Sequence, residues 1–149
     1  MVELSSYTRA VPGSSPGRPI MKKLLFVCSA NISRSPTAAE FFRACPEFDT
    51  KSAGTEPYAG GKPVSQDLVD WANIIFALSE KTNGHRTFLK EHFAIPQKTP
   101  IYDLDIPNGY LYGEPALQLL LLDRVSKYIS LSPKCMQKLD SLVPQRFHR

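Results

Sequence analysis

Residues 22–36 read KKLLFVCSANISRSP, a short apolar run followed at once by small polar residues. The run from Leu24 to Cys28 is uniformly apolar, which predicts a strand buried on both faces of a parallel sheet. Ser35 and Pro36 then predict the start of a helix, with Ser35 as its N-cap and Pro36 at the first helical position. The segment therefore predicts a strand, a short loop and a helix in direct succession.

The rest of the chain repeats this alternation of short apolar runs and amphipathic segments. Three further strands are expected, over residues 48–53, 73–78 and 101–104. Four helices are expected, over residues 35–45, 63–71, 82–93 and 115–129. This order predicts an α/β fold in which four parallel strands carry helices on both faces. Ligands are then expected at the carboxyl ends of the strands, near a switch in strand order.

A length of 149 residues predicts one folded domain. Residues 1–20 are rich in Pro, Gly and Ser and lack an apolar segment, so we expect a disordered extension, with Met21 as a plausible natural start. The domain is expected to span residues 21–131, followed by a basic C-terminal tail over residues 132–149.

The charge distribution gives no sign of a nucleic-acid partner. The formal net charge is +4, yet residues 21–130 hold 12 basic and 12 acidic side chains, so the excess lies at the two ends. The longest purely apolar run, Leu119–Leu122, is far shorter than the roughly 20 residues of a membrane-spanning helix. We expect neither a nucleic acid nor a membrane as a partner.

The cysteines and histidines predict no metal site. Cys28, Cys45 and Cys135 are too few and too widely spaced for a disulfide-rich secreted scaffold or a CxxC zinc module, which fits a reducing cytoplasm. Cys45 and Cys135 are interpreted as structural residues. The three histidines show no ligand spacing with cysteines or carboxylates, and no cofactor is predicted.

The loop that follows Cys28 carries the clearest chemistry in the chain. Backbone N–H groups between a strand end and a helix N-terminus form a concave nest for an oxyanion, and the helix dipole adds to its potential. Arg34 offers a planar fork that matches two phosphate oxygens. A thiol at Cys28 favours its nucleophilic thiolate in the same field. The expected phosphate-binding residues are Ser29, Ala30, Asn31, Ile32, Ser33, Arg34 and Ser35.

The stretch KKLLFVCSANISRSPTAAEFF resembles the opening strand, phosphate loop and first helix of the low-molecular-weight protein tyrosine phosphatases. The resemblance extends to SAGT at 52–55 and WANIIFAL at 71–78, and covers residues 22–130. It is closest to a shorter, mostly bacterial branch with a DIPxxY segment. It implies a three-layer αβα fold of flavodoxin-like type with a four-stranded parallel sheet. It also implies hydrolysis of phosphotyrosine or other aryl phosphates.

The resemblance also implies a role for individual loop residues. Cys28 is expected to attack phosphorus and form a cysteinyl-phosphate, while Arg34 holds the equatorial oxygens. Ser35 is expected to hydrogen-bond the thiolate. Asn31 is expected to hold the loop in a strained shape, with Ser52 supporting it.

Two loop positions depart from the family pattern. Ser33 replaces a cysteine that often protects the nucleophile, and Ala30 replaces a glycine. By sequence proximity, Cys45 is then the expected partner for an oxidised Cys28.

The resemblance also implies a general acid, which the larger family carries in an Asp-Pro pair soon after the fourth strand. The nearest equivalent here is Asp105-Ile106-Pro107, so the acid is expected at Asp105. A carboxyl group there could protonate the departing aryl oxygen and later activate water. Asp103, which projects from the same strand face, and Glu114 before Pro115 remain alternatives.

Three functions compete at this point. A cysteine-dependent phosphatase accounts for Cys28, Arg34 and an acid together. Arsenate reduction on the same fold would need further cysteines to pass a disulfide outward. A phosphate-binding module with weak catalysis is the third, because the acid motif is imperfect.

Overall fold

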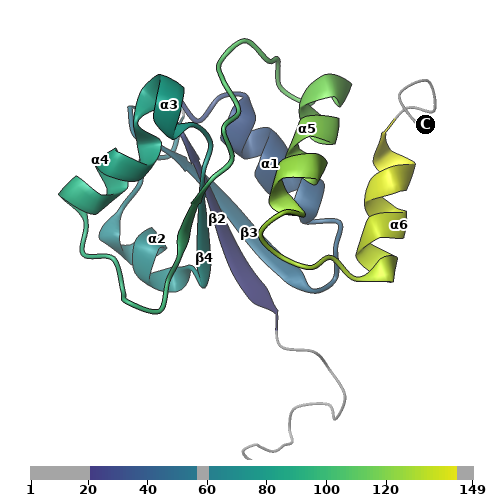
Figure 1. The fold of residues 1–149 in the computed structure, drawn as a ribbon, viewed down its shortest axis with the longest axis horizontal. Helices are drawn as coiled ribbons and strands as arrows, with labels where there is room; N and C mark the ends of the chain where they lie inside the picture. The colour runs from purple at the N-terminus through teal and green to yellow at the C-terminus, as the bar shows by residue number, and fades with distance from the viewer. Residues whose placement is uncertain (1–20, 57–60, 144–149) are drawn as a thin grey trace, which may run out of the picture.

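The computed structural model describes residues 21–56 and 61–143, and its centre is a sheet of four parallel strands (Figure 1). The strands are β2 (Lys22–Cys28), β3 (Phe48–Gly54), β4 (Ile74–Ala77) and β5 (Ile101–Asp103). They lie in the order β3-β2-β4-β5. The predicted parallel α/β sheet is confirmed, and the strand ends differ from the predicted ones by no more than about two residues.

Helices cover both faces of this sheet. They are α1 (Arg34–Phe42), α2 (Gln66–Trp71), α3 (Glu80–Asn83), α4 (His85–His92), α5 (Pro115–Val125) and α6 (Pro133–Leu142). One buried apolar cluster joins the sheet to α1, α5 and α6, and a second joins it to α2 and α4. Figure 1 shows these two groups of helices on opposite sides of the strands. The three-layer αβα arrangement is therefore confirmed.

The central strand β2 supplies both clusters because its side chains alternate between the two faces. Leu24 and Phe26 point to the α1, α5 and α6 side, whereas Leu25 and Val27 point to the α2 and α4 side. All four are fully buried, as the uniformly apolar run predicted. Cys28 continues the first row, so the strand delivers its sulfur to the end of the sheet on the α1 side.

The helix predicted over residues 82–93 is two helices. Ser79 caps α3, because its Oγ accepts from the Thr82 N–H at 3.1 Å. Gly84 then ends α3 with φ +66, a left-handed conformation that only glycine adopts at low cost. The chain turns there and α4 begins at His85. The break places the side chains of residues 83 and 85 beside the loop described below.

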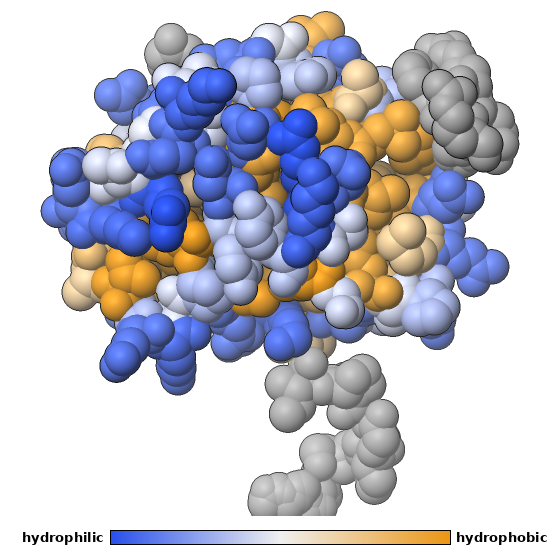
Figure 2. All heavy atoms as spheres, viewed as in Figure 1, coloured by the Kyte–Doolittle hydropathy of each residue, from blue (hydrophilic) through white to orange (hydrophobic). Residues whose placement is uncertain are grey.

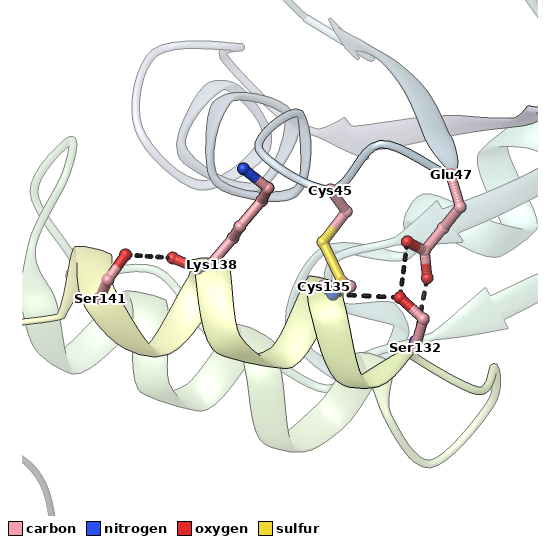
Figure 3. The surroundings of a disulfide bond; sticks show 6 residues. All are labelled: Cys45, Glu47, Ser132, Cys135, Lys138 and Ser141. Carbon is pink, nitrogen blue, oxygen red and sulfur yellow. Dashed lines mark hydrogen bonds between the residues drawn. A yellow bond between two sulfur atoms is a disulfide. The ribbon is translucent and has the colours of Figure 1, made fainter.

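The C-terminal segment is part of the domain up to residue 143, so the predicted tail boundary at 132 is wrong for these residues. Cys135, Leu139 and Val143 are buried in the cluster that contains α1. Ser132 caps α6 and donates through its hydroxyl to Glu47 at 2.9 Å (Figure 3). Helical spacing puts an apolar stripe on α6, and this stripe packs against the domain.

Cys45 and Cys135 form a disulfide that ties the segment after α1 to α6 (Figure 3). Both sulfurs are buried, while Cys28 remains a free, buried thiol. The expectation that Cys45 would pair with an oxidised Cys28 is therefore wrong, because Cys45 already has a partner 90 residues away. Sequence proximity did not predict this pairing, which depends on how α6 packs.

Figure 2 shows hydrophobic residues reaching the surface on the α5 and α6 side of the molecule. Met136 and Leu142 of α6 are 40% and 48% exposed. Among residues 21–56 and 61–143, no helix is long and apolar enough to cross a membrane. Residues 1–20 and 144–149, for which a disordered extension and part of a basic tail were predicted, lie outside the described residues.

Candidate phosphate-binding active site

Cys28 is the last residue of β2, which stands between β3 and β4 at the switch in strand order. The loop that follows packs closely against the end of β3. The Thr55 N–H donates to the carbonyl oxygen of Cys28 at 2.9 Å. The Glu56 N–H donates to that of Ser29 at 2.8 Å. Gly54 permits this approach, because a Cβ there would lie 2.6 Å from the Ser29 carbonyl oxygen.

The hydroxyl of Ser35 contacts Cys28 directly. Ser35 Oγ lies 2.9 Å from Cys28 Sγ, and both residues are buried. The same oxygen lies 3.0 Å from Asn31 Oδ1. Asn31 has φ 57, a left-handed conformation that a non-glycine residue adopts only where its surroundings enforce it. The loop is therefore turned at Asn31 and joined through Ser35 to the sulfur.

Two sequence expectations about this loop are wrong. Ser35 is not the N-cap, because α1 begins at Arg34 with Ser33 in the capping position, which leaves the Ser35 hydroxyl inside the loop. Support from β3 comes through the carbonyl oxygen of Ala53, 3.3 Å from Ser35 Oγ. Within the described residues, the Ser52 side chain is not the group that meets the loop.

Arg34 closes the loop at its other end and is 3% exposed. Its Nη1 donates to the carbonyl oxygen of Ile106 at 2.9 Å and to Asn83 Oδ1 at 3.0 Å. Burial lowers the pKa of Arg34, and the electrostatic interaction with Cys28 opposes that shift. A guanidinium stays protonated in proteins, so Arg34 supplies a fixed positive charge beside Cys28.

His85 is a residue of the site that the sequence analysis considered only as a metal ligand. Its ring is fully buried, Nε2 lies 2.9 Å from Ser29 Oγ, and Nδ1 accepts from the Ser79 N–H at 3.0 Å. Burial, together with the charge of Arg34, lowers the pKa of His85 to about 4, with Glu80 opposing part of the shift. The ring is therefore neutral near pH 7. In the sequence, the one feature that could have pointed to His85 as a site residue is its position directly after Gly84.

The proposed acid Asp105 lies beside the loop through its backbone. It adopts φ 55, and the next residue, Ile106, provides the carbonyl that holds Arg34. Its carboxylate is exposed and lies 3.9 Å from Arg124 Nη1 of α5. Arg124 also donates to the backbone carbonyl of Asp105 at 2.6 Å. The structure thus brings the Asp105 segment to the site, with the carboxylate facing α5.

The two alternative acids are engaged in local backbone contacts. Asp103 Oδ1 accepts from the Glu80 N–H at 2.9 Å and from the Asp105 N–H at 3.1 Å. Glu114 Oε1 accepts from the Leu111 N–H at 2.9 Å, within the turn that precedes α5. Both carboxylates therefore hold backbone N–H groups of nearby turns and strand ends.

Exposure differs between residues of the loop. Ile32 is 52% exposed, while Cys28 at the base of the loop is 2% exposed. Tyr112, in the turn before α5, is exposed and its hydroxyl contacts Glu40. Across residues 21–56 and 61–143, no three His, Cys, Asp or Glu side chains gather as a metal site would require.

No protein-family model matches the sequence, and no curated protein matches it significantly. Solved structures do resemble it. A low molecular weight protein tyrosine phosphatase from T. tengcongensis is 19% identical, with a TM-score of 0.55, over 72% of this chain and 99% of that chain. The YwlE arginine phosphatase from Geobacillus stearothermophilus is 24% identical, with a TM-score of 0.52, over 71% and 91%.

Wzb from Vibrio vulnificus, solved in complex with benzylphosphonate, is 17% identical with a TM-score of 0.52. The match covers 81% of this chain and 99% of that chain. At these identities the likeness concerns the backbone arrangement. The chain has the fold of the low-molecular-weight protein tyrosine phosphatases.

Proposed function

We propose that this protein is a cysteine-dependent phosphatase that hydrolyses phosphotyrosine or other aryl phosphates. One observation carries the proposal: Cys28 Sγ lies 2.9 Å from Ser35 Oγ in a loop whose other end holds the buried guanidinium of Arg34. A hydroxyl donor and a fixed positive charge beside a thiol favour the thiolate and an oxyanion bound above it.

The reaction uses a covalent intermediate. The Cys28 thiolate attacks phosphorus, so an S–P bond forms while the bond from phosphorus to the aryl oxygen breaks. Arg34 and the loop N–H groups of Ser29, Ala30, Asn31, Ile32, Ser33 and Ser35 bind the equatorial oxygens. Water then attacks the cysteinyl-phosphate, releasing phosphate and restoring the thiolate.

Asp105 is the proposed general acid. It would give a proton to the departing aryl oxygen and take one from the attacking water. Its place next to Ile106, which contacts Arg34, supports this assignment. The exposed carboxylate lies 3.9 Å from Arg124, so its use as an acid requires rotation of the side chain toward the loop.

The substrate is proposed to be a phosphotyrosine protein or a small aryl phosphate. Relatives of similar fold are named a tyrosine phosphatase and an arginine phosphatase, and one binds benzylphosphonate. Ile32 of the loop is half exposed, so a side chain of another protein could contact the loop there. The chemistry proposed needs no cofactor. We propose a cytoplasmic location because the nucleophile must stay a reduced thiol, as Cys28 is; the Cys45–Cys135 disulfide, a bond rare in reducing compartments, is evidence against this location.

Arsenate reduction fits less well, because the disulfide between Cys45 and Cys135 leaves Cys28 as the free thiol. A catalytically weak phosphate-binding module remains the second candidate, since the proposed acid faces α5. A phosphatase and a binding module would both bind phosphate, but only the phosphatase would turn over a phosphate ester.

Hydrolysis of para-nitrophenyl phosphate across pH 4 to 8 without added metal tests the proposal. We expect turnover by the wild type, none by Cys28→Ser, and a loss of at least about 100-fold in Arg34→Ala. Ser126→Ala, on a hydroxyl at the end of α5 that donates to the Asp123 carbonyl, is the control. Phosphate binding without wild-type turnover would favour the binding module. Peptides that carry phosphotyrosine or phosphoarginine then distinguish the two substrate classes.

A further inference from the structure

The two ends of the phosphate loop are both held by the short turn between α3 and α4. Asn83 accepts from Arg34 at 3.0 Å, and His85 contacts Ser29 at 2.9 Å. Gly84 lies between them with φ +66, and this turn directs its two neighbours toward the loop. Ser29 is the first residue after Cys28, so the contact lies next to the predicted nucleophile.

The hydrogen bonds of His85 determine which ring nitrogen carries the proton. Nδ1 accepts from the Ser79 N–H, so it has no hydrogen of its own. A neutral imidazole holds one proton, which must then be on Nε2. Nε2–H therefore donates to Ser29 Oγ. The ring cannot rotate freely, because it is fully buried between these two partners.

This contact determines what the Ser29 hydroxyl can do. Its oxygen accepts from His85, so its own hydrogen remains to be donated to another acceptor. We propose that His85 is a positioning residue that holds the Ser29 hydroxyl as a donor to an oxyanion bound in the loop. The proposal extends the phosphatase assignment and rests on it for the identity of the anion.

Two substitutions separate this role from a structural one. His85→Asn keeps an acceptor near the place of Nδ1, but its shorter side chain cannot reach Ser29. His85→Gln places an N–H near the position of Nε2 and gives up the Ser79 contact. A role in folding alone predicts that the Asn variant keeps its affinity for phosphate, whereas positioning predicts that the Gln variant keeps more of it.

The test measures the dissociation constant of inorganic phosphate by calorimetry, and kcat and KM for para-nitrophenyl phosphate. We expect His85→Asn to raise the dissociation constant and lower kcat/KM by about tenfold, as for the loss of one hydrogen bond to a charged group. His85→Gln should recover part of both. His92→Asn on the exposed end of α4 is the matched control and should leave both unchanged.

Ser29→Ala identifies the route of the effect. If His85 acts through Ser29, the double variant with His85→Asn should lose no more than Ser29→Ala alone. Losses that multiply would overturn the proposal, and so would wild-type phosphate affinity in folded His85→Asn. A ¹⁵N–¹H spectrum of the histidine rings should place the proton of His85 on Nε2, and a proton on Nδ1 would also refute the proposal.

The measurements distinguish this proposal from the proposed function. A wild type that binds phosphate without turnover would contradict the phosphatase, while a weakened His85→Asn would still support positioning. An active wild type with unchanged phosphate binding in His85→Asn would contradict positioning alone.

Discussion

Cys28 Sγ and Ser35 Oγ lie 2.9 Å apart and are buried together, although seven residues separate them in the chain. The loop between them therefore closes on itself, and the hydroxyl faces the sulfur. A hydroxyl in this position can donate to a thiolate and to the sulfur as it departs from phosphorus.

Ser35→Ala should reduce kcat/KM for para-nitrophenyl phosphate by about 10- to 100-fold, because a hydrogen bond to a charged group contributes roughly 1.5–3 kcal/mol. The rate of alkylation by iodoacetate at fixed pH should fall as well, and it reports Cys28 because the other two cysteines are paired. Ser126→Ala, on a hydroxyl that donates to the Asp123 carbonyl, is the control. Unchanged alkylation would remove Ser35 from this role.

The acid assignment predicts that substitution of Asp105 affects the rate of hydrolysis, whereas substitution of Asp103 affects stability. Asp105→Asn should slow hydrolysis of substrates with poor leaving groups more than of para-nitrophenyl phosphate, with little change in stability, because its carboxylate is exposed. Asp103→Ala should instead reduce the free energy of unfolding by about 1–3 kcal/mol, since it leaves two backbone N–H groups without their shared acceptor, Asp103 Oδ1. A series of substrates with different leaving groups measures the first effect, and urea unfolding measures the second. Equal leaving-group dependence in wild type and Asp105→Asn would reject this acid.

The free energy of unfolding should decrease at low pH because His85 is buried in its neutral form. Its pKa is about 4 in the folded protein and 6.5 when unfolded, so between these values the unfolded chain binds the extra proton. The contribution of His85 to the free energy of unfolding should therefore be fully present above pH 6.5. It should be lost, by about 3 kcal/mol, as the pH falls through 4. Burial and Arg34 oppose the charge, and Glu80 offsets part of this.

Urea unfolding at pH 7 and pH 4 measures this decline. His85→Asn should lack the histidine contribution, because its amide does not titrate. His92→Asn should decline as the wild type does, since that ring is exposed. An equal decline in the free energy of unfolding in wild type and His85→Asn would show that groups other than His85 cause the decline.

The disulfide should stabilise the attachment of α6. Closing a loop of 90 residues contributes up to about 4.6 kcal/mol by chain entropy. Dithiothreitol should therefore lower the melting temperature of the wild type and of Cys28→Ser, which keeps the disulfide. Cys135→Ser should melt lower and be insensitive to the reductant. Three reactive thiols in unreduced, unfolded protein would show that the bond is absent.

Local sequence determined the strand, the loop and the helix around Cys28, because apolar alternation, small residues and Pro36 act within a few positions. The same reasoning predicted the parallel sheet and two helical layers, since buried runs alternate with amphipathic segments. It failed at Ser35, whose capping propensity is real but is overridden by its contact with Cys28. It also missed the break at Gly84, because one glycine is compatible with a continuous helix.

Only the tertiary structure decided which distant residues complete the site. Ser29 meets His85 across 56 positions, and Arg34 meets Ile106 across 72. Cys45 meets Cys135 across 90. None of these pairs has a local signal, because each depends on how two elements pack after the sheet has formed. Short-range preferences thus determined the loop and its chemistry, while packing of the hydrophobic layers determined the partners that hold it.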